Sequence, residues 1–387
     1  MDIIAADELG LDPERLERLS TTIKYDVAQQ KYDGAVVMVA RSGAVALQEA
    51  IGFADRAKNR VMRPDSVFCL FSVTKTLTTT TILQRIDRGE LALTTRVADL
   101  IPEFGCKGKQ RVTVAQLLTH TGGMSSGFPP VAPQDTGNLA AVVAATCQQG
   151  PEAIPGSEVC YSPITAHAML AEIVRRLDGG KRSFREILAM DVFQPLQMKD
   201  TALGLPKRLI ERRVPVVVRD RSEGLFPPEA LESFNMFLTE ECEIPAGGVV
   251  GTAADIFRFA EMLRRGGELD DVRVLSPAII ELATTNHTGQ MPNGLWNYAC
   301  ELHGWDEFPA YLGLSFFLRG VGIFPTYFGT MATPGTFGGI GAGSTIFWVD
   351  PERDVTFVCL TAGLLEESNS LLRFQRLSDL VHAAVID

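Results

Sequence analysis

The stretch of sequence that decides the fold is Val67-Phe68-Cys69-Leu70-Phe71-Ser72-Val73-Thr74-Lys75, and a helical pattern follows it as far as Gly89. An apolar run ends at Ser72, so this serine is expected near a helix start, with Lys75 one turn later on the same face. A serine hydroxyl becomes a good nucleophile only when a base takes its proton. Burial and the positive end of a helix dipole both lower the pKa of a lysine, so Lys75 can be that base. The pattern predicts a nucleophilic Ser72 activated by Lys75; the alternative is a helix-capping serine followed by a surface lysine.

A tyrosine far along the chain is the second candidate. Tyr161 lies in the loop 155–163, directly before an amphipathic helical pattern over residues 166–177. A phenol beside a cationic lysine can have a lowered pKa and can shuttle a proton. We therefore predict Tyr161 as a catalytic residue, with a buried aromatic that closes the loop as the alternative.

A glycine-rich segment near the end of the chain is the third candidate. Residues 336–343 read Thr-Phe-Gly-Gly-Ile-Gly-Ala-Gly and run into a predicted strand. Glycines such as Gly339 and Gly341 let a substrate approach the backbone closely. The backbone N–H of Ala342, together with that of Ser72 at its helix N-terminus, can then bind an oxyanion. A flexible glycine loop is the alternative.

Both ends of the chain carry the same kind of pattern. Strands are predicted over residues 35–41, 44–50, 344–349 and 355–361, with amphipathic helices at 13–34 and 371–384. These segments predict an α+β fold, in which an antiparallel sheet built from both chain ends is flanked by the terminal helices and joined to a helix-rich second lobe. We expect one catalytic domain over residues 1–387, with lobes at about 1–60 plus 310–387 and at about 61–309. A site is expected in the cleft between the lobes.

Composition excludes several classes of function. The formal net charge of −11 does not favour nucleic acids or anionic membranes. No stretch is apolar enough to span a membrane, and the N-terminus lacks the pattern of a secretory signal, so a cytoplasmic protein is expected. The seven cysteines and five histidines show no metal-ligand spacing, so no metal site is expected.

The three elements together, in this order, resemble the serine β-lactamase-like and penicillin-binding-protein-like superfamily, in particular its class C branch with the family VIII esterases. The resemblance covers nearly the whole chain and rests on five segments: Ser72-Val73-Thr74-Lys75, residues 117–124 (LLTHTGGM), Tyr161-Ser162-Pro163, residues 244–248 (IPAGG) with Asp255 and Phe259, and Gly339-Ile340-Gly341. The resemblance implies that Ser72 forms an acyl-enzyme while Lys75 and Tyr161 move the protons, and that neither a metal nor an organic cofactor takes part.

Two departures from the family pattern bear on the substrate. Pro163 stands where the family has an asparagine that contacts the substrate amide, and Gly339 stands where it has a lysine or histidine. We therefore expect a hydrolase of a small carboxylic ester or amide rather than a β-lactamase or D-peptidase. An acyltransferase using the same acyl-enzyme is the main alternative, and a binding or scaffold protein on this fold is the alternative outside enzymes. The pattern indicates no oligomeric state.

Overall fold

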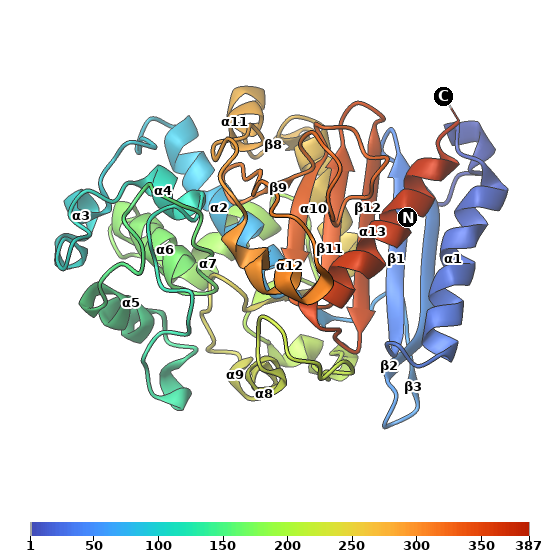
Figure 1. The fold of residues 1–387 in the computed structure, drawn as a ribbon, viewed down its shortest axis with the longest axis horizontal. Coiled ribbons are helices and arrows are strands. Elements are labelled where there is room, and N and C mark those ends of the chain that lie inside the picture. Colours follow the sequence, from blue (N-terminus) through green and yellow to red (C-terminus); the bar gives the residue numbers. More distant parts are fainter. Residues whose placement is uncertain (1, 387) are drawn as a thin grey trace.

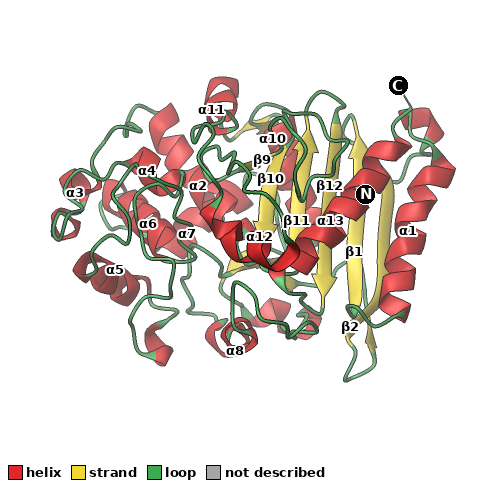
Figure 2. Cartoon of the chain, viewed as in Figure 1, coloured by secondary structure: helices red, strands yellow, loops and turns green. Residues whose placement is uncertain are grey.

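The computed structural model of the protein describes residues 2–386 and is built around a seven-stranded antiparallel sheet in the order β3-β2-β1-β12-β11-β10-β9 (Figures 1 and 2). The strands of this sheet are β1 (Gly34–Arg41), β2 (Ala44–Asp55), β3 (Arg60–Val61), β9 (Phe317–Leu318), β10 (Phe337–Gly341), β11 (Thr345–Asp350) and β12 (Val355–Ala362). The two ends of the chain meet where β1 pairs with β12, with Gly34 opposite Ala362 and Arg41 opposite Val355. This pairing confirms the predicted α+β fold with a sheet built from both chain ends.

The terminal helices α1 (Pro13–Ala28) and α13 (Glu367–Ala384) lie side by side on one face of the sheet (Figure 1). Helix α10 (Ala253–Arg264) packs against β1, β11 and β12 from the other side. The side chain of Asp12 caps α1 by accepting the Arg15 N–H, and Pro13 occupies the first turn, where its missing N–H costs nothing. Helix α1 ends at Ala28, six residues before the first residue of β1 and earlier than the predicted end near Gly34.

The middle of the chain is mostly helical and lies beside the end of the sheet formed by β9 and β10 (Figure 2). Its helices are α2 (Val73–Asp87), α3 (Val97–Leu100), α4 (Val114–Leu118), α5 (Leu139–Gln148), α6 (Thr165–Leu177), α7 (Phe184–Leu188), α8 (Pro228–Glu232), α9 (Phe234–Phe237), α11 (Pro277–Ala283) and α12 (Asn297–His303). Two small sheets complete it: β4 (Phe68–Cys69), β6 (Val249–Gly251) and β5 (Ala202–Leu203) in one, β7 (Glu268–Leu269) and β8 (Val272–Arg273) in the other. We keep the predicted lobe boundaries near residues 60 and 310 as a proposal.

Helix α2 is the central element, because it packs against α6 on one side and against β10 on another. Its residues from Val73 to Arg85 are all buried. The helix is nevertheless rich in threonines, most of whose hydroxyl groups donate to backbone carbonyls: Thr78 donates to Pro245 O at 2.6 Å, and Thr80 donates to Thr76 O at 2.9 Å. Because these polar groups are paired, the burial of α2 leaves no unmet hydrogen bond at those positions.

The glycine-rich segment is strand β10 and not the loop before a strand, which corrects the sequence-based expectation. A Cβ atom on Gly338 would lie 2.1 Å from Phe347 O, and one on Gly339 would lie 2.6 Å from Phe347 Cε1. The glycines therefore allow β10 to pack closely against β11 and α2.

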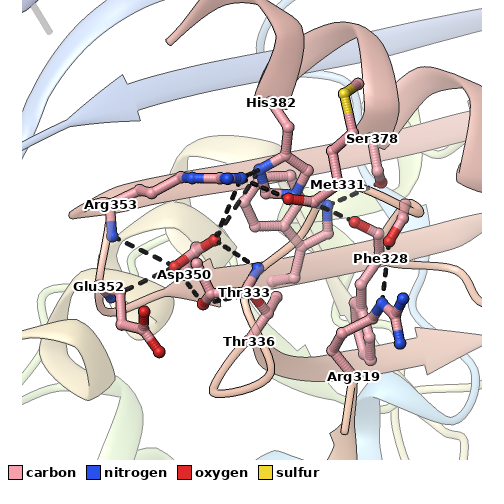
Figure 3. A network of polar contacts seen from close by, with 12 residues as sticks. Arg319, Phe328, Met331, Thr333, Thr336, Asp350, Glu352, Arg353, Ser378 and His382 are labelled. Carbon is pink, nitrogen blue, oxygen red and sulfur yellow. Dashed lines mark hydrogen bonds and ion pairs between the residues drawn. The ribbon is translucent and has the colours of Figure 1, made fainter. Parts of the chain in front are cut away.

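The chain that leads into β10 is held by a buried polar network around Asp350, which is 0% exposed (Figure 3). One carboxylate oxygen of Asp350 accepts the Thr333 hydroxyl at 2.7 Å and the Arg353 N–H at 3.2 Å. His382 of α13 lies beside the same carboxylate, and one of its ring nitrogens is 3.1 Å from Phe328 O. Burial lowers the pKa of His382 to about 4. The network fastens the segment before β10 to the sheet and to α13.

The apolar residues of the predicted helix over 371–384 do not all face the core. Leu371 is 1% exposed and belongs to the core, whereas Leu372 is 39% exposed. Over residues 2–386, no helix combines the length and apolar character needed to cross a membrane. All seven cysteines are free thiols.

Candidate active site

Ser72 lies at a sharp turn between β4 and α2. Phe71, directly before it, has a φ of +45°, a left-handed conformation that is unfavourable for a residue with a bulky side chain. Such strain is found mainly where the surrounding structure holds a functional residue in place. Here the turn is fixed by the Leu70 N–H, which donates to Val249 O at 2.9 Å. The turn leaves Ser72 at the N-terminus of α2, as the sequence predicts.

Lys75 reaches back to the serine from the first turn of α2. Its Nζ lies 2.9 Å from Ser72 Oγ, 2.8 Å from Pro163 O and 3.0 Å from Ala246 O. The residue is 3% exposed, and none of the ion pairs found over residues 2–386 involves it. Burial lowers the pKa of Lys75 from 10.5 to about 7. A large fraction of the amine is therefore uncharged near neutral pH.

Tyr161 completes the group, because its hydroxyl lies 2.9 Å from Ser72 Oγ. Its pKa is raised to about 12, first by burial and then by the nearby Glu367, against the lowering effect of the hydrogen bond to Ser72. The sequence-based expectation of a lowered pKa for Tyr161 is therefore wrong. It assumed a charged lysine beside the phenol, whereas the buried lysine is largely neutral and stabilises a phenolate little.

Two buried histidines support this group from behind. His120 Nδ1 accepts the Ser162 N–H at 3.1 Å, and its ring centroid lies 4.6 Å from that of Tyr161. Burial lowers the pKa of His120 to about 3, so this imidazole is neutral and adds no charge beside Lys75. His167, on α6, lies 3.1 Å from Ser315 Oγ. The sequence singled out His120 as a structural residue but gave no signal for the position of His167.

The structure divides the predicted oxyanion residues between the pockets and the interior of the fold. Ala342 borders the same two pockets as Ser72. Of the hydrogen bonds formed among residues 2–386, none uses the backbone N–H of Ser72 or that of Ala342, so both remain available to a ligand. Gly339 and Gly341 face away from the pockets: a Cβ on Gly339 would meet Phe347, and a Cβ on Gly341 would lie 2.3 Å from Leu70 O.

Two apolar pockets meet at Ser72 and share Phe226 and Ala342 as walls. The first, which we call the Phe234 pocket, is lined by Phe71, Ser72, Phe128, Pro163, Ile164, Phe226, Leu231, Phe234, Ala246, Gly247 and Ala342. The second, which we call the Trp296 pocket, is lined by Ser72, Tyr161, Leu225, Phe226, Leu295, Trp296, Phe317, Tyr327, Ile340, Ala342 and Glu367.

The sequence identified these lining residues only in part. The apolar stretch 312–327 of the sequence fits an acyl pocket and core equally well; its Phe317 and Tyr327, together with Trp296, line the Trp296 pocket. Phe316 is core, at 0% exposure. Phe226 and Glu367 were not foreseen, because each comes from a segment with no recognisable motif. Nowhere in residues 2–386 do three or more histidine, cysteine, aspartate or glutamate side chains gather as metal ligands.

Comparison with known proteins identifies the family. Residues 19–380 match the family profile described as Beta-lactamase. The chain belongs to the beta-lactamase family. The resemblance inferred from the sequence motifs is thereby confirmed, and with it the prediction of a serine hydrolase of this family.

Two curated relatives extend over most of this beta-lactamase family chain. Penicillin-binding protein 4 of Amycolatopsis lactamdurans is 33% identical over 276 residues, which cover 68% of this chain and 69% of that protein. The Esterase/beta-lactamase LipL of Mycobacterium tuberculosis is 25% identical over 363 residues, which cover 87% of this chain and 78% of that protein.

A solved structure shares the whole fold. The penicillin-binding protein homologue from Caulobacter crescentus superimposes with a TM-score of 0.80 at 26% identity, covering 99% of this chain and 100% of that one. The fold of that protein therefore extends over nearly the whole of this chain.

Proposed function

We propose that the protein hydrolyses a small carboxylic ester or amide through an acyl-enzyme on Ser72. The observation that carries the proposal is the 2.9 Å contact between Ser72 Oγ and the buried Nζ of Lys75. A neutral amine has two N–H groups and one lone pair. The carbonyls of Pro163 and Ala246 accept both N–H groups, so the lone pair is left for the proton of Ser72.

In the proposed first half-reaction, Lys75 takes the proton of Ser72 as Oγ attacks the acyl carbon. The N–H groups of Ser72 and Ala342 hold the negative charge that develops on the carbonyl oxygen. Tyr161 then gives its proton to the leaving alcohol or amine as the carbon–heteroatom bond breaks. Water enters in the second half, gives its proton to the same group of side chains and releases the acid.

The pocket linings support an ester over a β-lactam or a peptidoglycan stem. Pro163 offers a carbonyl to Lys75 where the family has an asparagine side chain for the substrate. Neither the Phe234 pocket nor the Trp296 pocket has a lysine, arginine or histidine among its lining residues, so a substrate carboxylate finds no cation there. The name of the relative LipL includes both an esterase and a β-lactamase. The residues that line the two pockets of this chain favour the esterase activity.

Acyl transfer is the second candidate function, and one observation favours it. The site has two pockets on either side of Ser72, so an acceptor alcohol can occupy one while the acyl group stays in the other. The rings of Trp296, Phe317 and Tyr327 make the second pocket apolar and able to exclude water. The two functions share the same acyl-enzyme and differ only in what enters after it forms.

Intact-mass spectrometry of the protein mixed with a panel of short esters, amides and β-lactams tests the proposal. The expected result is a gain of one acyl group with the esters, located on Ser72 by peptide mapping and absent from Ser72→Ala. Chromogenic ester turnover by the same two proteins also separates an enzyme from a scaffold. Turnover that survives Ser72→Ala, or an adduct on another residue, removes Ser72 as the nucleophile.

A further inference from the structure

A buried acidic side chain with one unpaired oxygen borders the active site. Glu367 is the first residue of α13, is 4% exposed and lines the Trp296 pocket together with Ser72 and Tyr161. Its Oε1 atom is buried and has no hydrogen-bond partner. No ion pair involving Glu367 is found in the part of the chain that the structure describes. A buried carboxyl oxygen left unpaired beside a nucleophile needs a partner that comes from outside the chain.

The neighbouring Glu366 shows by contrast what a structural acid looks like in this helix. Its two oxygens accept the Tyr298 hydroxyl at 2.7 Å, the Ser368 N–H at 3.0 Å and the Asn369 N–H at 3.1 Å. Glu366 therefore caps α13 and is fully used. The Glu367 carboxyl accepts hydrogen bonds from its own backbone N–H and from those of Leu225 and Phe226, but its Oε1 has no partner, so these structural contacts do not account for that oxygen.

Aromatic rings surround the pocket into which Glu367 is built. Five of its lining residues are aromatic: Tyr161, Phe226, Trp296, Phe317 and Tyr327. The ring centroids of Trp296 and Tyr327 lie 5.8 Å apart. Aromatic walls joined by one carboxyl group favour an organic cation, because the ring faces carry negative potential and the carboxyl adds a negative charge when it loses its proton. The net charge of −11 adds a field that draws cations toward the protein.

The place of Tyr161 indicates which part of a substrate occupies this pocket. In the proposed reaction Tyr161 protonates the leaving group, so the leaving group lies on the Tyr161 side of Ser72. Tyr161 lines the Trp296 pocket and not the Phe234 pocket. The Phe234 pocket is then left for the acyl group.

We propose that Glu367 and the rings around it form a subsite for a positively charged ammonium group carried by the leaving alcohol or amine of the substrate. This inference rests on the proposed function, because it uses the role of Tyr161 to orient the substrate. It narrows the substrate class to esters or amides of cationic alcohols or amines. In acyl transfer, the same subsite would select a cationic acceptor.

Burial raises the pKa of Glu367 to about 8, with Glu366 adding to the effect. The titratable groups that face it are the carboxyl of Glu366 and the phenols of Tyr161, Tyr298 and Tyr327. None of these groups is a cation. A bound ammonium group would therefore be the only positive charge among the groups that face Glu367, and the carboxyl of Glu367 would lose its proton when the ammonium group binds.

A matched pair of esters tests the subsite. Acetylcholine and 3,3-dimethylbutyl acetate have the same shape and the same acyl group, and differ in that only the first is charged. We expect the wild type to prefer acetylcholine by about tenfold in kcat/KM, and Glu367→Gln to lose that preference, measured as the ratio of the two kcat/KM values within each protein. Glu223→Gln, which removes one exposed acid from the nearby loop, serves as the control for overall charge and keeps the preference.

The outcomes separate the subsite from the proposed function. Hydrolysis of both esters with equal kcat/KM by the wild type, or a preference that survives Glu367→Gln, overturns the subsite and leaves the esterase intact. Calorimetric binding of choline to Ser72→Ala, in competition with 3,3-dimethylbutanol, tests the subsite without any turnover. Choline binding in the absence of ester hydrolysis would support the subsite and remove the proposed function. If Glu367→Gln fails to fold, the ratio of kcat/KM for the two esters with the wild type and the choline binding of Ser72→Ala decide whether the subsite exists.

Discussion

Lys75 and Tyr161 approach the same atom, Ser72 Oγ, at 2.9 Å each, and their pKa values are displaced in opposite directions. The pKa of Lys75 falls to about 7 and that of Tyr161 rises to about 12, in both cases mainly through burial. The ordinary pKa values of 10.5 and 10.0 nearly coincide, so burial is the main cause of the separation between the two groups. Two neighbouring groups separated in this way divide into a base and an acid. Lys75 is then suited to accept the proton of Ser72, and Tyr161 to donate one.

The first prediction concerns pH. Because Lys75 must be uncharged to accept a proton, kcat/KM for a neutral ester should rise with pH and level off above about pH 7. Lys75→Arg carries a charge at every accessible pH and should lose at least about a thousandfold in kcat/KM. Stopped-flow or plate assays of p-nitrophenyl acetate from about pH 5.5 to about pH 8.5 measure the profile. A profile that is flat across that range contradicts the assignment of Lys75 as the base.

The second prediction separates the role of Tyr161 from that of Lys75. Tyr161→Phe keeps the ring that packs on His120 and removes only the hydroxyl. If the hydroxyl protonates the leaving group, esters with poor leaving groups should lose about a hundredfold or more in kcat/KM. Esters of p-nitrophenol, which leaves readily as an anion, should lose much less.

A series of acetate esters with leaving alcohols of increasing pKa makes this measurement. The slope of log kcat/KM against leaving-group pKa should become steeper in Tyr161→Phe than in the wild type. Equal losses across the whole series would mean that Tyr161 acts on Ser72 and not on the leaving group. Circular dichroism of the variant serves as the folding control.

What the sequence could predict depends on distance along the chain. Ser72 and Lys75 are three residues apart on one helix, so helix geometry alone brings them together. Tyr161 could be placed beside them only through the family resemblance, since 89 residues separate it from Ser72. Glu367 and Phe226 reach the pocket through tertiary packing of α13 against the loop before α8, and no local sequence pattern predicts that contact.

Two local errors in the sequence analysis have the same cause. The glycines of residues 338–341 resemble a loop because their intrinsic preference is for turns, yet packing against Phe347 and Thr76 demands them in a strand. Leu372 fits a hydrophobic helix face but is exposed, because α13 turns its other side to the core. In both cases the conformation or burial of the residue is determined by neighbours in space that are distant in the sequence, so a local sequence pattern does not show them.

The third prediction follows from the packing of β10. In Gly339→Ala the new methyl group would lie 2.6 Å from Phe347 Cε1 and 3.1 Å from Thr76 Cγ2. We expect a loss of about 1–3 kcal/mol in the free energy of unfolding, together with lower ester turnover as β10 moves away from Ser72. Gly150→Ala is the matched control, since its nearest neighbour would be Lys107 O at 3.7 Å. Urea unfolding of both variants checks the difference, and equal stabilities would contradict the close packing described for β10.

The last prediction concerns the stability cost of Glu367. Its pKa is raised from 4.5 to about 8 on folding, mainly by burial, so between these values the folded protein holds a proton that the unfolded chain releases. The free energy of unfolding therefore falls as the pH rises from about 4.5 to about 8, by up to about 1.4 kcal/mol per pH unit. Glu367→Gln cannot ionise and should be more stable than the wild type at pH 8 by roughly 2–4 kcal/mol, but nearly equal to it at about pH 5. Urea unfolding of the wild type, Glu367→Gln and the exposed control Glu223→Gln at the two pH values isolates this group, because all other titrations cancel in the difference. If Glu367→Gln exceeds the wild type in free energy of unfolding by the same amount at both pH values, the carboxyl of Glu367 ionises at its ordinary pKa. The description of Glu367 as a buried acid that is mainly neutral without a ligand would then be wrong.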